Sequence, residues 1–219
     1  MIVIFDLDGT LLNTIDDLGY ACNYALEQTG YPTYPIEAYP AKVGNGINNL
    51  IRRALPEEAR TEENILRVRA HFVPYYDAHN CDYTRPYDGI LELLAELKAQ
   101  GHLLAVASNK YQAATEKIVN HFFPGVFDVI LGERVGVERK PDPQIVFDIL
   151  DNLTGTASAD PTISDLLYVG DSLVDCETAT NANVPFVACS WGFVPRERLR
   201  EAGVALLVDQ PKEILKLIK

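Results

Sequence analysis

The sequence is poor in cysteine, and the cysteines that it has are isolated. The four lie far apart, at Cys22, Cys81, Cys176 and Cys189. They show neither the close pairs of a zinc site nor the density of a disulfide framework. We therefore favour buried, reduced thiols, with a structural disulfide as the less favoured alternative.

The sequence also lacks a long apolar run and an excess of basic charge. No stretch approaches the roughly 20 apolar residues that a membrane helix needs, and the first residues lack the basic start and cleavage site of a secretory signal. The formal net charge is −12, with a pI near 4.7, which argues against non-specific binding to nucleic acid or acidic lipid. We expect a cytoplasmic protein, monomer or homodimer, without a nucleic-acid or membrane partner.

The 219 residues have an ordinary globular balance, 47% hydrophobic and 23% charged, and allow one large domain or one domain with an insertion. Residues 2–5 (IVIF) predict a strand buried on both faces, because no polar residue alternates with the apolar ones. Residues 14–83 then show only helical periodicity. From Gly89 onward, strands alternate with helices, which indicates a parallel sheet covered on both faces.

This pattern predicts an α/β fold, with a Rossmann-like parallel sheet core and an inserted all-helical domain. The core would comprise residues 1–13 and 84–219, and the insertion residues 14–83. In an open parallel sheet the functional site lies just beyond the carboxyl ends of the strands. Four segments place polar residues there: Asp6 and Asp8 in "DLDGT", Ser108 and Asn109 in "ASNK", Lys140 in "RKPDP", and Asp171 and Asp175 in "GDSLVD".

Carboxylates that meet at one edge of a sheet repel one another, and a cation relieves that repulsion. Mg²⁺ prefers oxygen ligands, typically one or two carboxylates with waters and a substrate phosphate, and Asp6 with Asp171 meets this requirement. Asp6 follows its strand directly and is placed to act as a nucleophile. Asp8 can then protonate the leaving oxygen and later deprotonate the attacking water.

Ser108 and Asn109 offer hydrogen-bond donors to phosphoryl oxygens, and Lys140 supplies positive charge to the same group. Each motif alone has a simpler interpretation. The Asp-Xaa-Asp-Gly stretch is usually a polar turn, "SN" a helix cap or loop start, and Lys140 a solvated residue before a helix. The four together, in this order and at strand ends, favour an enzyme.

In that order the motifs "DLDGT", "SN", "KPDP" and "GDSLVD" resemble those of the haloacid dehalogenase superfamily. The resemblance implies that Asp6 is the nucleophile and a Mg²⁺ ligand. It also implies that Asp8 is the acid/base and lends its backbone carbonyl to the metal. Asp171 would be the third ligand, supported by Asp175.

The resemblance further implies that Ser108 and Lys140 hold the phosphoryl group. The helical insertion is similar to the type 1 cap of this superfamily. "VGNGINNLIRRAL" in the insertion and "WGFVPRERLREAGVALLVDQPKEIL" near the C-terminus resemble phosphoglycolate phosphatase-like members. Asn13 departs from the pattern, since many relatives carry an acidic residue there.

The expected function is a Mg²⁺-dependent phosphatase that hydrolyses a small phosphorylated metabolite through an aspartyl-phosphate. One alternative is a phosphotransferase such as a sugar phosphomutase, although Thr10 resembles the hydrolases better. A second is a non-catalytic regulatory binding protein of the same fold. A carbon–halogen hydrolase is disfavoured, because that chemistry needs neither an acid/base at Asp8 nor Mg²⁺.

Four further residues have two interpretations each. Lys42, Arg52 and Arg53, in the helical insertion, are candidates for binding a second anionic group, or else are solvated helix charges. Trp191 either lines the cleft or packs against the helical insertion. The sequence leaves these alternatives open.

Overall fold

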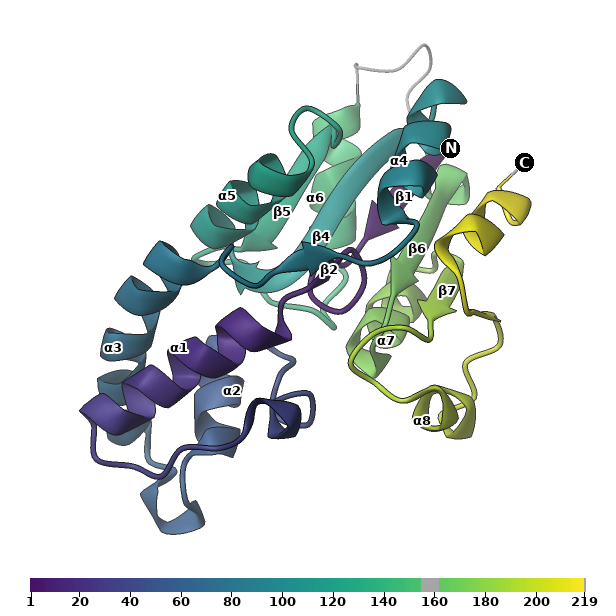
Figure 1. Cartoon of the computed structure of the whole chain (residues 1–219). Helices are drawn as coiled ribbons and strands as arrows, with labels where there is room; N and C mark the ends of the chain where they lie inside the picture. Colours follow the sequence, from purple (N-terminus) through teal and green to yellow (C-terminus); the bar gives the residue numbers. More distant parts are fainter. Residues whose placement is uncertain (155–161, 219) are drawn as a thin grey trace. The chain divides into compact units, whose positions relative to one another are not determined.

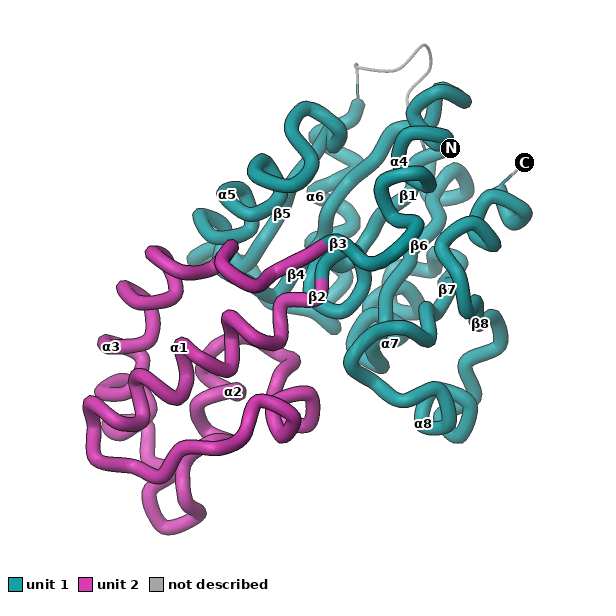
Figure 2. Tube along the Cα trace, in the orientation of Figure 1, with its two compact units in different colours: residues 1–12, 86–219 teal, residues 13–85 magenta. Residues whose placement is uncertain are grey.

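The computed structural model describes residues 1–154 and 162–218. The chain divides into two compact units (Figure 2), unit 1 with residues 1–12 and 86–219 and unit 2 with residues 13–85. Lys219 and residues 155–161, which the expected core range 84–219 includes, lie outside the described residues.

Unit 1 is built on a six-stranded sheet (Figure 1), in the order β5-β4-β1-β6-β7-β8. All five strand pairs are parallel. The strands are β1 (Ile2–Phe5), β4 (Leu103–Tyr111), β5 (Val129–Glu133), β6 (Leu166–Gly170), β7 (Phe186–Cys189) and β8 (Leu207–Val208). The expected α/β parallel fold is therefore confirmed, with the first strand inside the sheet as its apolar sequence predicts.

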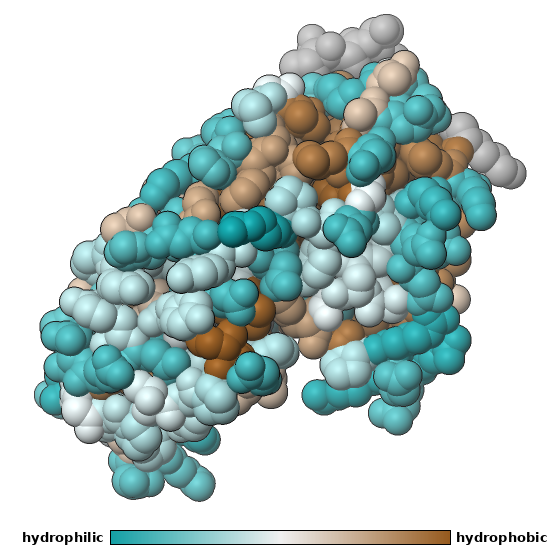
Figure 3. Space-filling model, viewed as in Figure 1, coloured by the Kyte–Doolittle hydropathy of each residue, from teal (hydrophilic) through white to brown (hydrophobic). Residues whose placement is uncertain are grey.

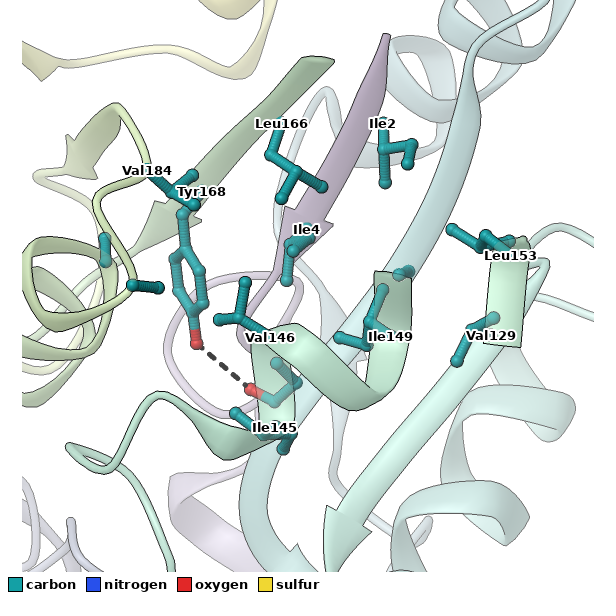
Figure 4. Packing of buried hydrophobic residues seen from close by; sticks show 14 residues of the cluster. Ile2, Ile4, Val129, Ile145, Val146, Ile149, Leu153, Leu166, Tyr168 and Val184 are labelled. Atoms are coloured by element: carbon teal, nitrogen blue, oxygen red, sulfur yellow. Dashed lines mark hydrogen bonds between the residues drawn. The ribbon is translucent and has the colours of Figure 1, made fainter. Parts of the chain in front are cut away.

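Helices pack against this sheet through apolar side chains. The helices of unit 1 are α4 (Ile90–Ala99), α5 (Gln112–Phe122), α6 (Gln144–Leu153), α7 (Leu173–Asn181) and α8 (Arg196–Glu201), with 3-10 turns η3 (Ile163–Asp165) and η4 (Pro211–Lys216). On one face, Ile145, Val146 and Ile149 of α6 pack on Ile2 and Ile4 of β1 (Figure 4). Burial of these side chains is the main source of stability for the core.

Some details differ from the expectation. Ser108 and Asn109, expected just beyond the end of a strand, lie within β4, which continues to Tyr111. The last described element, η4, is a 3-10 helix. Helix α8 has only six residues, too few to leave a clear periodic signal.

Unit 2 is mainly helical, with α1 (Ile15–Gln28), α2 (Ile47–Ala54) and α3 (Glu62–His79) and the 3-10 turns η1 (Ile36–Ala38) and η2 (Glu57–Ala59). Two short strands, β2 (Leu12–Asn13) and β3 (Arg85–Pro86), form a separate two-stranded sheet. Helix α3 begins after Thr61, whose hydroxyl accepts a hydrogen bond from the Asn64 amide at 3.3 Å. Such a cap satisfies one of the free N–H groups at a helix start.

Asp17, in the first turn of α1, ties the two ends of unit 2 together. Its carboxylate accepts hydrogen bonds from the amide of Tyr83 at 3.0 Å and from the amide and hydroxyl of Thr84 at 2.9 and 2.7 Å. The side chain is buried. Its position near the N-terminus of a helix also favours a negative charge.

The face of the molecule seen in Figure 3 is mostly hydrophilic, in keeping with the net charge of −12. Within the described ranges, we find no helix whose length and apolar composition would let it cross a membrane.

Replacement of Asp17 by alanine should lower the free energy of unfolding by about 2–4 kcal/mol, because buried donors lose a charged acceptor. The measurement is urea unfolding followed by circular dichroism. Asp16→Ala, one residue earlier and partly exposed, is the matched control and should cost less than about 1 kcal/mol. Equal losses in the two variants would contradict this role of Asp17.

Candidate active site

The site begins where β1 ends. The Asp6 amide donates to the Val169 carbonyl of β6 at 2.9 Å, so Asp6 still belongs to the sheet backbone. The chain then turns back in a tight loop, in which the amides of Leu11 and Leu12 both donate to the Leu7 carbonyl at 3.0 Å. This loop holds the carboxylate of Asp6 at the strand end, as the sequence predicts.

Asp171 reaches the same place because it follows β6, the strand beside β1. Its Oδ2 accepts a 2.7 Å hydrogen bond from the Phe193 amide, and its Oδ1 accepts one from the Thr10 hydroxyl at 3.3 Å. Gly9, at φ +87°, and Gly192 both lie against this carboxylate, and a methyl group on either would overlap it. Asp171 is therefore held between two backbone segments that only glycine allows to come so close.

Lys140 extends into the buried centre of the site. Its ammonium donates to Asp6 Oδ1 at 2.9 Å, to Asp175 Oδ1 at 2.7 Å and to the Ala107 carbonyl at 2.8 Å, with the Tyr168 hydroxyl at 3.2 Å. The lysine side chain is only 2% exposed. Its three protons are thus directed at groups of the protein itself, one of which is the expected nucleophile.

Asp175 is placed by the start of α7. Its Oδ2 accepts from the amide and hydroxyl of Ser172 at 3.1 and 2.6 Å, while the Ser172 hydroxyl accepts from the Asp175 amide at 3.3 Å. This reciprocal pair is a capping box. Oδ2 of Asp175 bonds to Ser172 in the cap, and Oδ1 accepts a hydrogen bond from the Lys140 ammonium. Asp175 therefore holds the lysine in place.

Tyr168 is a further partner of this buried group. Its hydroxyl lies 3.5 Å from the Ala107 carbonyl (Figure 4) and 3.4 Å from Asp175 Oδ1. Burial raises the pKa of the Tyr168 phenol well above its ordinary value, so the hydroxyl stays protonated and can donate to these acceptors.

Ser108, Asn109 and Lys110 lie in an irregular part of β4. Ala107 pairs with Leu131 and Tyr111 pairs with Glu133, so three residues of β4 face one residue of β5. Such a bulge redirects side chains near functional sites.

The bulge gives its residues different partners. The Asn109 amide group bonds to both the amide and the carbonyl of Lys140, each at 2.9 Å. Asn109 therefore holds the backbone of Lys140, whereas we had expected it to face a phosphoryl group. The Ser108 hydroxyl accepts from the Lys110 amide at 3.2 Å.

Asp8 forms an ion pair that the sequence did not suggest. Its Oδ2 lies 3.1 Å from the ammonium of Lys110, and the two side chains are 18% and 5% exposed. Lys110 follows Ser108 and Asn109 in the quoted "ASNK", but no pattern in the sequence pairs it with Asp8. Gly192 and the Phe193 amide were missed for a similar reason, because their roles depend on backbone proximity to Asp171.

The charges at the centre of the site do not balance. Ligand oxygens of Asp6, Asp171 and Asp175 all lie within 4.8 Å of one another. Within the described part of the chain, the only cation paired with any of them is Lys140, which bonds to Asp6 and Asp175. Burial raises the pKa of Asp6 from 3.8 to about 7, Asp175 adds to the rise and Lys140 opposes it. Burial likewise raises the pKa of Asp171 well above its ordinary value. If all four groups are charged, the excess is two negative charges, which one divalent cation would neutralise.

The other candidate residues have partners of their own. In unit 2, Arg53 donates to the carbonyls of Lys42, Val43 and Gly44, each at 3.0 Å. Arg52 donates to Asn49 at 2.6 Å and lies 3.5 Å from Glu62, and the Lys42 ammonium lies 4.0 Å from the Tyr34 ring centre.

In unit 1, the Trp191 indole N–H donates to the Thr10 carbonyl at 3.0 Å. Both residues belong to unit 1, so this hydrogen bond ties Trp191 to the loop after β1 and tests neither interpretation.

A parallel sheet that gathers carboxylates and a lysine at the carboxyl ends of its strands defines a Rossmann-like α/β core with an acidic site, and comparison with known proteins identifies its family. The family model described as haloacid dehalogenase-like hydrolase matches residues 3–189. The chain belongs to this family, which confirms the resemblance seen in its motifs.

Individual relatives cover nearly the whole chain. A phosphoglycolate phosphatase of Cereibacter sphaeroides is 32% identical, over 98% of this chain and 97% of the relative. A phosphoglycolate phosphatase from Aquifex aeolicus is 30% identical, over 99% of this chain and 96% of the relative. The crystal structure of a proposed phosphoglycolate phosphatase from Lactobacillus delbrueckii is similar with a TM-score of 0.91 and 34% identity, over 99% of this chain and 97% of that one.

The raised pKa of Asp6 predicts a pH-dependent stability when divalent cations are removed with EDTA. Below about pH 4 the carboxyl is protonated in both the folded and the unfolded protein. Between about pH 4 and 7 only the unfolded protein ionises it, so the folded protein should lose stability as the pH rises.

The measurement is the free energy of unfolding of the wild type minus that of Asp6→Asn, which lacks the titrating group. This difference should decrease from pH 4 to pH 7 and then level off. A difference in unfolding free energy that stays constant or increases from pH 4 to pH 7 would contradict a raised pKa of Asp6 in the folded protein.

Proposed function

We propose that this protein is a phosphomonoester hydrolase, and that 2-phosphoglycolate is its substrate. The observation that carries the proposal is the buried group of three carboxylates around one lysine at the end of β1, in which Lys140 contacts Asp6 at 2.9 Å. The names of the relatives support the substrate, since phosphoglycolate phosphatases are about 30% identical over almost all of the chain.

The residues of the site fit a magnesium ion. Two carboxylates, Asp6 and Asp171, with the backbone carbonyl of Asp8, form the all-oxygen donor set that Mg²⁺ prefers. The excess negative charge described above supports a divalent cation in particular. When bound, the ion would neutralise charge on the phosphoryl group and orient it. Asp175 belongs to the same acidic group, but its two oxygens already bond to Lys140 and Ser172.

The reaction proceeds in two displacements. The Asp6 carboxylate attacks phosphorus, a phosphorus–oxygen bond to Asp6 forms, and the bond to the leaving oxygen breaks while Asp8 gives that oxygen its proton. Asp8, now a carboxylate, then takes a proton from a water molecule that attacks the aspartyl-phosphate. The water oxygen bonds to phosphorus while the phosphorus–oxygen bond to Asp6 breaks, so inorganic phosphate leaves, the Asp6 carboxylate is restored and Asp8 is again protonated.

Lys140 acts on the nucleophile in this scheme. Its ammonium holds Asp6 Oδ1 and stabilises the carboxylate in a buried site, and Asn109 fixes the lysine backbone. Ser108 and Lys140 are the proposed contacts to the phosphoryl group. Unit 2 is proposed to be the type 1 cap, since it is mainly helical and is inserted between the first and second motifs.

Asp6→Asn should lower phosphate release at least 10³-fold, because the amide is a poor nucleophile, while the circular dichroism spectrum stays that of the wild type. The assay measures phosphate release from 2-phosphoglycolate and a panel of sugar and nucleoside monophosphates, with and without EDTA. Asp151→Asn, at an exposed position of helix α6, is the control and should keep full activity.

The panel distinguishes the alternatives. Isomerised sugar phosphate without phosphate release would identify a phosphomutase. Failure of the wild type with Mg²⁺ to release phosphate from any member would support a regulatory binding protein. Full activity of Asp6→Asn would exclude the aspartyl-phosphate mechanism.

Magnesium should raise the midpoint of thermal unfolding, since it binds the folded protein. At a concentration 100 times its dissociation constant the gain is about 2.7 kcal/mol. Asp171→Asn should lose most of this gain, because one ligand and one charge are removed. Calcium is the comparison ion in the same measurement. If magnesium raised the unfolding midpoint of Asp171→Asn as much as that of the wild type, the magnesium would bind at a site that does not include Asp171.

A further inference from the structure

We propose that Lys110 is a positioning residue for Asp8, and that it supports the proton transfer to the leaving oxygen. This inference rests on the proposed phosphatase function. It arises from the ion pair between Lys110 Nζ and Asp8 Oδ2 at 3.1 Å, which involves none of the three carboxylates around Lys140.

The backbone of Lys110 is fixed from several sides. Its amide donates to the Ser108 hydroxyl at 3.2 Å, and its carbonyl accepts from the Thr115 hydroxyl at 3.0 Å. The same carbonyl lies so close to Gly132 that a methyl group there would overlap it. Lys110 therefore starts from a rigid point in the β4 bulge, and a side chain on a rigid element positions its partner accurately.

The side chains of the pair are also restricted. That of Lys110 is 5% exposed and that of Asp8 is 18% exposed, so solvent screens their attraction less than it would on the surface. Asp8 itself lies in the loop after β1, two residues beyond Asp6. A bond to Oδ2 from a fixed ammonium restricts the rotation of the Asp8 carboxyl group, and thereby the position from which it can transfer a proton.

The pair also places positive charge where negative charge develops. When Asp8 gives its proton to the leaving oxygen, it becomes a carboxylate beside the Lys110 ammonium. A charge that is already in position stabilises such a transition state without further reorganisation. The benefit depends on the leaving group, because only a basic leaving oxygen needs the proton.

This dependence provides the test. The leaving group of 2-phosphoglycolate is the alkoxide of glycolate, which needs protonation. The leaving group of acetyl phosphate, a substrate of similar size, is acetate, which does not. For Lys110→Met we expect the ratio of kcat/KM for 2-phosphoglycolate to that for acetyl phosphate to fall at least tenfold, mainly through kcat. Lys110→Arg should restore part of the ratio.

Two comparisons make the test specific. Lys98→Met removes the lysine of another lysine–aspartate pair beside β4, with Asp128 at 3.0 Å, and should leave the ratio unchanged. In an Asp8→Asn background, Lys110→Met should cause no further change in the ratio, because the residue through which it acts is gone.

Several outcomes would overturn the inference. An equal loss on both substrates would indicate a structural role, and a higher KM for both with unchanged kcat would indicate phosphate binding by Lys110. An additive effect in the Asp8→Asn background would show that Lys110 acts independently of Asp8. A wild type that hydrolyses neither substrate would instead refute the proposed function.

Discussion

The site depends on one buried ammonium group. Lys140 bonds to two carboxylates, a backbone carbonyl and a phenol at the end of the central strand. A charge moved from water into an apolar interior is costly unless it is paired, and here the lysine and the carboxylates each need the other. Even so, the carboxylates outnumber the lysine. The core is therefore built with a deficit of positive charge, and a divalent ion is the natural complement to this deficit.

Most of the polar side chains near Lys140 bond to the protein itself. Asn109 uses its amide on the Lys140 backbone, and Asp175 divides its oxygens between Lys140 and the cap of α7. Asp171 is held by Thr10 and by the Phe193 amide. Groups fixed in this way lose little freedom when a substrate arrives. Many of the polar residues at the strand ends thus serve to hold the Lys140 ammonium and the Asp171 carboxylate in place.

The sequence predicted the fold class, because its apolar segments are typical of buried strands. It also predicted that Asp6, Lys140 and Asp171 lie together, because parallel strands place their carboxyl ends at one edge of the sheet. The pairing of Lys110 with Asp8 was not predictable. It arises from the bulge in β4, and a bulge changes the direction of side chains without a marker in the residue pattern. The close approach of Gly192 to Asp171 was hidden as well, since any loop glycine looks alike in sequence.

The position of β1 within the sheet has a consequence for how the protein is made. Its partners are β4, where Ile2 pairs with Leu103, and β6, where Ile2 pairs with Leu166. During synthesis about half of the chain is therefore made before the first neighbour, β4, is complete, and β6 is complete only at Gly170. Pairings over such long sequence separations form slowly. The acidic loop consequently remains hydrated in the nascent polypeptide, and its carboxylates become confined only after Lys140 has left the ribosome to join them.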